Sequence, residues 1–239
     1  MKILAIGAHP DDIELGCGGT LLSAAKDGHD VYMLTMTRGA ASGDPLERVS
    51  ELEQSARFIG AKGIRIDDLP DTRLTSKTTE LIKNIEDYID EVDPDVIFTH
   101  SRGDEHHDHR AVAAATSEAA RFYSNVLSYE IPLTKEFNPV IYYDITDVLD
   151  GKIQLIRLFW SQSAKLYLQA NAIKALSEYR ALQGRLNYSM NNVEAFEVIR
   201  LCLDGDFKLM KAAFAKPETK PEASCIVNRI FSCLSRMWQ

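Results

Sequence analysis

Short apolar segments alternate with amphipathic segments in the first half of this chain, and this alternation limits the fold more than any other feature. The apolar segments have the length of buried strands, and each precedes a segment with the apolar spacing of a helix. The strand segments are 2–7, 31–35, 64–66 and 96–99, and the helix segments are 16–28, 48–59, 80–92 and 111–123. We therefore predict an α/β fold, a Rossmann-like doubly wound, mostly parallel sheet with helices on both faces.

The order of these strands decides where a ligand would bind. If the order is 3-2-1-4, the first and fourth strands flank the topological switch point, where open α/β sheets bind their ligands. Beyond residue 127 the pattern is weaker, and it predicts one strand at 141–145 and helices at 148–164 and 166–182.

The C-terminal residues predict a linker followed by a short segment. Residues 216–222, KPETKPE, combine two prolines with alternating charges, which disfavour both helix and strand. We expect one folded domain over residues 1–215 and a short amphipathic helix within 223–239, in which Arg229 and Arg236 are the only charged side chains. This helix is expected to dock on the domain, to dock on a sister subunit of a homo-oligomer, or to contact a membrane surface.

Composition excludes several classes of protein. A net charge of -8 and a pI of about 5.3 argue against a nucleic-acid-binding protein, because such proteins need a broad basic surface to displace phosphate counterions. The chain has no signal-peptide core and no uninterrupted apolar run of membrane-spanning length, so we expect a cytoplasmic protein. Its four cysteines lack CxxC spacing and therefore predict no thiolate zinc site.

The segment AHPDDIELGCGG, which ends at Gly19, places an imidazole and carboxylates at the end of the first strand. Pro10 restricts the backbone, so His9 and Asp12 can point toward one site while Asp11 points elsewhere. The alternative is that the two aspartates only cap the helix that follows and complement its dipole.

A second polar segment, THSRGDEHHDHRAV, follows the fourth strand and contains four of the six histidines of the chain. His106, Asp108 and His109 lie within four residues at a helix entry, so one imidazole ligand and one orienting carboxylate can come from the same turn. At the switch point of the sheet, His9, Asp12 and His109 would then meet in one crevice.

Three protein ligands without a thiolate leave one position for water, which is typical of a catalytic zinc site. Zinc lowers the pKa of such a water toward about 7, and a neighbouring carboxylate can accept its proton during attack on a carbonyl. Asp11 is the candidate base. His106, paired with Asp108 and protonated, is the candidate for stabilising the oxyanion.

With these two motifs, the chain resembles the PIG-L/LmbE-like family of zinc-dependent N-deacetylases. The resemblance extends through TRG at 37–39, LPDTRL, the pattern from Asp144 to Gln162 and VEAF at 193–196. It implies that His9, Asp12 and His109 bind Zn²⁺ or another divalent cation, one ion per chain, that Asp11 is the base, and that His106 is the electrophilic partner. The implied substrates are amides of the N-acetylglucosamine type.

Two positions depart from the family pattern. Residues 40–42 are Ala, Ala and Ser, where the family often has Glu shortly after TRG, so contacts in that loop are expected to differ. His107 takes the place of a proline between the two key histidines, and we expect its side chain to turn away from the metal.

Arg48 has two interpretations on sequence. It binds a carbonyl or phosphate of the substrate, or it pairs with Glu51 on one helix face at i,i+3 spacing. The glycines of GCGG follow the acidic cluster rather than the strand, and those acidic groups would repel a pyrophosphate, so we do not expect a dinucleotide site.

The sequence thus predicts a deacetylase of N-acetyl sugars or their conjugates, with a small-molecule or glycoconjugate substrate. One alternative is an amidase for a larger acyl or thiol-conjugate amide, with the same metal centre and a different pocket. The other is a metal-binding protein without turnover, which would lack the base and the electrophile that Asp11 and His106 provide here.

Overall fold

A single twisted sheet organises the part of the chain that the computed structural model describes, residues 1–184 and 190–202. Its strand order is β3-β2-β1-β4-β5-β7-β6. The five strands from β3 to β5 are parallel, and β7 and β6 continue the sheet in antiparallel pairing. The strands are β1 (Lys2–Gly7), β2 (Asp30–Thr35), β3 (Gly63–Ile66), β4 (Val96–His100), β5 (Asn125–Tyr129), β6 (Ile141–Asp144) and β7 (Val193–Leu201). The predicted doubly wound, mostly parallel sheet is confirmed.

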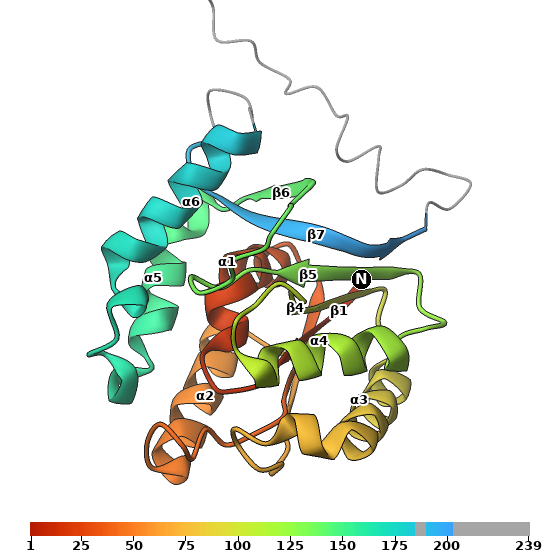
Figure 1. Ribbon diagram of the computed structural model, residues 1–239. Coiled ribbons are helices and arrows are strands. Elements are labelled where there is room, and N and C mark those ends of the chain that lie inside the picture. Colours follow the sequence, from red (N-terminus) through yellow and green to blue (C-terminus); the bar gives the residue numbers. More distant parts are fainter. Residues whose placement is uncertain (185–189, 203–239) are drawn as a thin grey trace, which may run out of the picture. The chain divides into compact units, whose positions relative to one another are not determined.

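Helices cover both faces of this sheet (Figure 1). They are α1 (Asp12–Lys26), α2 (Pro45–Ile59), α3 (Thr78–Val92), α4 (His107–Ala119), α5 (Leu149–Arg157) and α6 (Ala170–Gly184). Two apolar cores result, one under α1, α2 and α5 and the other under α3 and α4. Ile3 and Ala5 of β1 belong to the first core, whereas Leu4 and Ile6 belong to the second. The apolar run of β1 follows from this burial on both faces, because successive side chains of a strand point to opposite sides.

The central strands β1 and β4 form the switch point of the sheet. They pair in parallel, with Ile3 opposite Val96, while the chain proceeds outward from them in opposite directions, through β2 and β3 on one side and β5 on the other. The loops that follow β1 and β4 therefore leave the same edge at neighbouring positions. The strand order 3-2-1-4 on which the predicted crevice depends is present.

Two strands were not predicted from the sequence. β5 is short, and it lies where the alternation of strand and helix patterns weakens. β7 carries charged residues within an apolar run, and one of them, Glu194, is buried with a charged partner. A charged side chain inside a strand can be buried only when it has a partner, and the sequence alone does not show that partner.

Several helices also begin or end elsewhere than predicted. α1 begins at Asp12 and α4 at His107, each four residues before the predicted start, so Asp12 of the first motif and Asp108 and His109 of the second lie in the first turn of a helix. α4 ends at Ala119 rather than at 123, and α5 ends at Arg157 rather than at 164. Short 3-10 turns separate α5 from α6, which begins at Ala170.

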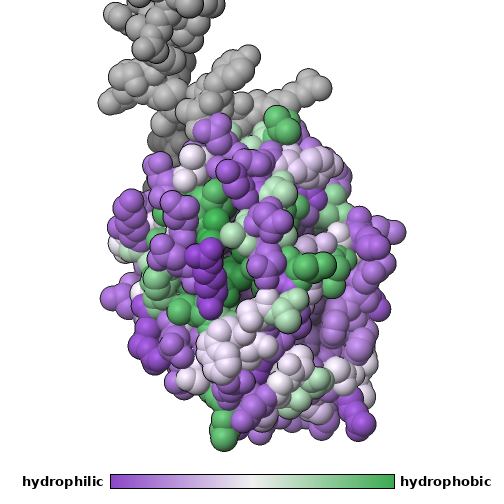
Figure 2. Space-filling view, turned by 90° about the vertical axis from the view of Figure 1, so that its left-hand side faces the viewer, coloured by the Kyte–Doolittle hydropathy of each residue, from purple (hydrophilic) through white to green (hydrophobic). Residues whose placement is uncertain are grey.

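Residues Met1–Leu201 form one compact unit. The predicted domain end at 215, the linker 216–222 and the helix within 223–239 all lie outside the described residues. None of the described helices has both the length and the apolar composition needed to cross a membrane. Figure 2 shows that apolar side chains on the face that it displays are interrupted by polar ones.

Gly16 of α1 provides a test of the packing between α1 and the sheet. A Cβ atom added to Gly16 would lie 2.1 Å from the ring of Tyr129, which is buried and donates a hydrogen bond to the carbonyl oxygen of Ile6 at 2.8 Å. We expect Gly16→Ala to lower the free energy of unfolding by about 1–3 kcal/mol, as overpacked cores do, despite the higher helix propensity of alanine. Urea denaturation measures this change.

Gly151→Ala is the matched control, because Gly151 lies in α5 and an added Cβ would meet only Leu22, at 3.4 Å. This variant is expected to gain about 0.5–1 kcal/mol from helix propensity. Equal free energies for the two variants would contradict the packing described for Gly16.

Candidate metal centre and active site

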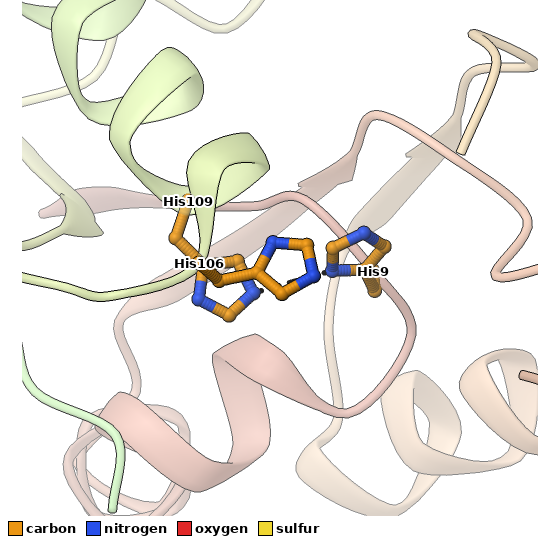
Figure 3. A group of neighbouring side chains, drawn as sticks. All are labelled: His9, His106 and His109. Atoms are coloured by element: carbon orange, nitrogen blue, oxygen red, sulfur yellow. Dashed lines mark hydrogen bonds between the residues drawn. The ribbon is translucent and has the colours of Figure 1, made fainter. Parts of the chain in front are cut away.

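The two polar motifs meet at the switch point, where the loop after β1 faces the first turn of α4. His9 comes from that loop, His106 caps α4 and His109 lies in its first turn, with the three rings directed toward one another (Figure 3). They lie in a pocket whose further lining includes catalytic candidates, loop residues and apolar side chains. The lining residues are His9, Asp11, Asp12, Leu15, Ala41, Ser42, Arg48, Asp71, Thr72, His106, His109, Ile131, Pro132, Leu133, Lys165 and Tyr167.

The structure brings the side-chain ligand atoms of His9, Asp12 and His109 close enough together to bind one ion. His9 Nδ1 lies 3.2 Å from His109 Nε2, and the Asp12 carboxylate lies 3.3 Å from His9 Nδ1 and 3.4 Å from His109 Nε2, through different oxygens. Ligand atoms at about 2.0–2.1 Å from a tetrahedral zinc ion are separated by about 3.3 Å. The three side chains therefore fit one small cation.

In both rings, the nitrogen that points away from the centre contacts one or more carboxylates. His109 Nδ1 lies 3.1 Å from Asp104, and His9 Nε2 lies 3.0 Å from Asp71 and 3.3 Å from Asp108. An imidazole that donates its outer N–H to a carboxylate keeps the lone pair of its other nitrogen available to a metal. His9 thus presents Nδ1 to the centre, and His109 presents Nε2.

This arrangement supplies the strongest indication that a cation belongs here. Two neutral rings whose outer nitrogens are donors would place two lone pairs face to face at 3.2 Å. Such a contact is repulsive unless a proton or a metal ion lies between the nitrogens. The residues present therefore fit a metal ion with nitrogen and oxygen ligands.

Among the described residues, three groups have the spacing of metal ligands: His9 with His106 and His109, Asp12 with His100 and His109, and His9 with Asp71 and Asp108. In the second group, His100 Nε2 is 3.1 Å from the backbone N–H of Ala8, from which it accepts a hydrogen bond. That lone pair is therefore already used. His9, Asp12 and His109 are not one of these three groups but combine members of the first two, and their ligand atoms lie 3.2–3.4 Å from one another.

The charges of these groups depend strongly on one another. Burial lowers the pKa of His9, but hydrogen bonds with Asp108, Asp12 and Asp71 outweigh it and hold that pKa well above its ordinary value. Burial raises the pKa of Asp12, yet His109 and His100 bring it well below its usual range. The metal-free centre therefore holds a proton at the position where the fit indicates a cation.

Asp11 lies beside the candidate ligands rather than among them. Its backbone is left-handed, with a φ of 106°, and its side chain makes no capping hydrogen bond to α1. The interpretation that this aspartate only caps the helix is therefore wrong. Burial raises its pKa to about 6, against the opposing charge of Arg48, which is 3.3 Å away. A carboxylate with a pKa near 6 in a pocket suits proton transfer near neutral pH.

The prediction that Asp108 pairs with His106 is wrong. His106 Nδ1 accepts a hydrogen bond from the backbone N–H of Asp108 at 3.2 Å, because His106 caps α4. The Asp108 carboxylate accepts instead from the backbone N–H groups of Thr72 and Leu74, at 2.7 and 3.0 Å, and faces His9. Asp108 orients His9, and the carboxylate that orients His109 is Asp104.

The expected protonation of His106 also differs. Burial and the neighbouring His109 and His9 lower the pKa of His106, so the ring is neutral at neutral pH. Since Nδ1 accepts the backbone N–H, the ring hydrogen lies on Nε2. His106 is thus a neutral hydrogen-bond donor on the pocket wall.

Arg48 and Glu51, which were expected to pair if Arg48 did not bind substrate, have different partners. Arg48 is buried and donates to the Asp11 carboxylate and to the carbonyl oxygen of Pro10. Glu51 accepts from the backbone N–H and the hydroxyl group of Ser161, at 2.7 and 2.8 Å. Arg48 lines the pocket, and its hydrogen bonds reach Pro10 and Asp11 of the loop after β1.

Other residues have clear positions in the structure but no predicted role. His107 is on the exposed side of α4, with Nε2 2.8 Å from the carbonyl oxygen of Thr72. Asp71, which sequence reasoning missed as a partner of His9, follows β3 at the same edge of the sheet, and that position was its available signal. Lys165 and Tyr167 line the pocket from the segment after α5, and no motif marks them.

Comparison with known proteins matches the region that contains this centre to a family. The PIG-L family, described as GlcNAc-PI de-N-acetylase, matches residues 4–120. The chain is 34% identical over 152 residues to the uncharacterized deacetylase YaiS of Escherichia coli (strain K12), covering 61% of this chain and 82% of that protein. It is 29% identical over 187 residues to diacetylchitobiose deacetylase of Thermococcus kodakarensis, covering 67% of this chain and 70% of that protein.

Among solved structures, GalB of Pseudomonas putida KT2440, a 4-carboxy-2-hydroxymuconate hydratase, has the same fold. The TM-score is 0.71 at 17% identity, over 85% of this chain and 98% of that one. Because this neighbour is a hydratase, the fold by itself does not identify a reaction, whereas the residues of the site and the sequence relatives point to one.

Two histidines of α4 give a direct test of the ligand set. We expect His109→Ala to lose bound metal, because the centre then lacks one of its two imidazoles. His107→Ala, two residues away on the exposed side of the helix, is expected to keep it. Metal content after gel filtration, measured by plasma mass spectrometry, distinguishes them, and normal content in His109→Ala would point to a different ligand set.

Metal binding should also depend on pH. The raised pKa of His9 means that the metal-free centre carries a proton at neutral pH, and a metal ion must displace it. We expect about one proton released per ion at pH 7, and an apparent affinity that falls about tenfold for each unit of acidification. Calorimetry in two buffers of different ionisation enthalpy counts the protons. Release of none would contradict the shared proton between His9 and His109.

Proposed function

This chain belongs to the PIG-L family, and we propose that it is a zinc-dependent N-deacetylase that removes the acetyl group from an N-acetylglucosamine-type sugar or its conjugate. The observation that carries the proposal is the 3.2 Å approach of His9 Nδ1 to His109 Nε2, completed by Asp12, beside a buried Asp11. Centres of this kind, with nitrogen and oxygen ligands and no thiolate, are typical of zinc hydrolases. Both named deacetylase relatives are consistent with this chemistry.

The ion would be held by His9, Asp12 and His109, and when bound it supplies the positive charge that polarises an amide carbonyl and acidifies a water molecule. Asp11 accepts a proton from the attacking water as the water oxygen adds to the carbonyl carbon. The same carboxyl group then delivers that proton to the leaving nitrogen as the C–N bond breaks. The products are a free amine and acetic acid, which loses its proton to solvent and becomes acetate at neutral pH.

His106 and Arg48 assist in different ways. The Nε2–H group of His106 is the donor available on the pocket wall to the oxygen that becomes negative during attack, a contribution of about 3 kcal/mol in comparable enzymes. Arg48 holds the carboxylate of Asp11 and the carbonyl oxygen of Pro10, so it fixes the base relative to the ligand loop. A direct contact of Arg48 with substrate remains a prediction.

The pocket supports a sugar amide as substrate. Tyr167 offers an aromatic face, and Leu15, Ile131 and Pro132 offer apolar surface next to the polar centre. Aromatic and apolar side chains of this kind suit the less polar faces of a sugar ring, while the acetyl group reaches the metal. The larger thiol-conjugate amide and a metal-binding role without turnover are outcomes that the experiments below distinguish.

Location and assembly stay predictions. A cytoplasmic location, a homo-oligomer and a membrane contact through residues 223–239 are compatible with the described residues but find no support in them.

The direct test of the reaction uses the metal-free protein reloaded with Zn²⁺. N-acetylglucosamine, diacetylchitobiose, an N-acetylglucosaminyl lipid and a thiol-conjugate amide are each offered, and free amine is measured. We expect amine from one or more of the three N-acetyl sugars and its loss on treatment with a chelator. Amine from the thiol conjugate alone would establish the amidase alternative, and no amine from any substrate despite bound zinc would favour the silent metal-binding protein.

If Asp11 is the base, its replacement should lower turnover without affecting metal binding. Asp11→Asn should retain metal, because the ligands remain, while kcat falls about 10²–10⁴-fold through loss of the base. Asp87→Asn, at an exposed position of α3 where Asp87 pairs with Lys83, is the matched control and should leave kcat unchanged. Normal turnover in Asp11→Asn would refute the assignment of the base.

A further inference from the structure

Helix α1 is interrupted at Cys17, little more than one turn after the candidate ligand Asp12. Cys17 has φ and ψ angles of -141° and 15°, far from those of a helix. The short first part of α1 carries Asp12 and also Leu15, which lines the pocket. The angle between this part and the remainder of α1 therefore affects where Asp12 lies.

A buried ion pair serves both sides of this interruption. Lys152 Nζ of α5 donates to the carbonyl oxygen of Leu15 at 2.7 Å. Glu194 of β7 accepts from the backbone N–H groups of Gly19 and Thr20, at 2.8 and 2.7 Å, and from the hydroxyl group of Thr20 at 2.6 Å. Lys152 and Glu194 are 2.5 Å apart and both nearly inaccessible to solvent.

These contacts satisfy the backbone groups that lose their hydrogen-bond partners where the helix is interrupted. In a continuous α-helix, the carbonyl oxygen of Leu15 would accept from the N–H of Gly19. Here Lys152 binds that carbonyl oxygen and Glu194 binds that N–H. The carboxylate also acts as an N-cap for the second part of α1, since it takes the orphan N–H groups of the new first turn.

The glycines after Cys17 are explained by the same contacts. A Cβ atom on Gly19 would lie 3.1 Å from Glu194 Oε1 and 2.9 Å from Ile145, and one on Gly18 would lie 2.9 Å from Leu155. Side chains at these positions would push β7 and α5 away from α1. The GG pair of GCGG thus allows the close approach of the ion pair.

The first part of α1 is anchored on other sides as well. Glu14 accepts a hydrogen bond from the hydroxyl group of Ser55 in α2, and Gly16 packs against the ring of Tyr129 in β5. The free end of this part, toward Cys17, is held by the Lys152 contact to Leu15. Removal of that contact would leave the carbonyl oxygen unpaired and the rotation of this turn less restricted.

We propose that Lys152 and Glu194 are positioning residues for the metal centre: they fix the interruption of α1 and thereby direct the Asp12 carboxylate toward His9 and His109. The inference rests on the metal site of the proposed function. A charged pair suits this role because both members are buried, so any shift of α1 leaves an ammonium or a carboxylate without its partners.

The test measures metal affinity of the folded, metal-free protein by competition with a chromophoric zinc chelator, with no substrate present. We expect Lys152→Met to bind Zn²⁺ at least about tenfold more weakly than the wild type. Lys2→Met is the matched control, because Lys2 Nζ also donates to a helix carbonyl, that of Val92 in α3, at 2.8 Å, and this contact lies away from the pocket. Its zinc affinity should equal that of the wild type.

A second pair of variants separates positioning from a loss of folding. Glu194→Gln keeps an oxygen acceptor and nearly the same shape. If Lys152→Met does not fold, Glu194→Gln replaces it in the test, and we expect the same weaker binding of Zn²⁺. The double variant Lys152→Met/Glu194→Gln, without a lone buried charge, should lose less affinity than the sum of the single losses. Near-ultraviolet circular dichroism checks that each compared variant is folded.

The outcomes distinguish this inference from the function on which it rests. A wild type that binds no zinc would overturn the proposed function. A wild type that binds zinc, together with folded Lys152 or Glu194 variants of equal affinity, would overturn the positioning role alone. An equal loss in Lys2→Met would also overturn it, because the effect would then follow from any lost lysine contact.

Discussion

The contact between His9 Nδ1 and His109 Nε2 is the interaction on which the rest of the site depends. The two nitrogens are 3.2 Å apart, and carboxylates occupy the opposite side of both rings. Only a positive charge between the nitrogens stabilises this arrangement. The parallel pairing of β1 with β4 makes the contact possible, because it brings the loop of His9 beside the first turn of α4, which carries His109.

The carboxylates around the two rings explain why a cation and not only a proton is expected. Asp12, Asp71, Asp104 and Asp108 all lie against His9 or His109, and interactions with those rings hold the pKa of every one of them below its ordinary value despite burial. A single shared proton compensates little of this charge, whereas a divalent ion compensates more. Asp11 differs from these four, because burial raises its pKa to about 6 although the charge of Arg48 opposes that rise.

The sequence predicted the fold and the meeting of the motifs, because apolar periodicity and residues at strand ends are local features. It could not predict which carboxylate holds which ring. Asp71 lies on a different loop, and Asp108 turns its carboxylate toward the backbone of Thr72 and Leu74 rather than toward its near neighbour His106. Such choices depend on contacts between segments distant in the chain, as does the burial of Glu194 in β7.

A crystal structure of the zinc-loaded protein, with anomalous diffraction recorded on both sides of the zinc edge, tests the central claim most directly. The account predicts one peak bonded at about 2.0–2.2 Å to His9 Nδ1, Asp12 and His109 Nε2. A peak held instead by His106 in place of Asp12, or by the outer nitrogen of His9 with Asp71 and Asp108, would contradict it. So would a zinc-loaded protein whose peak contacts neither His9 nor His109.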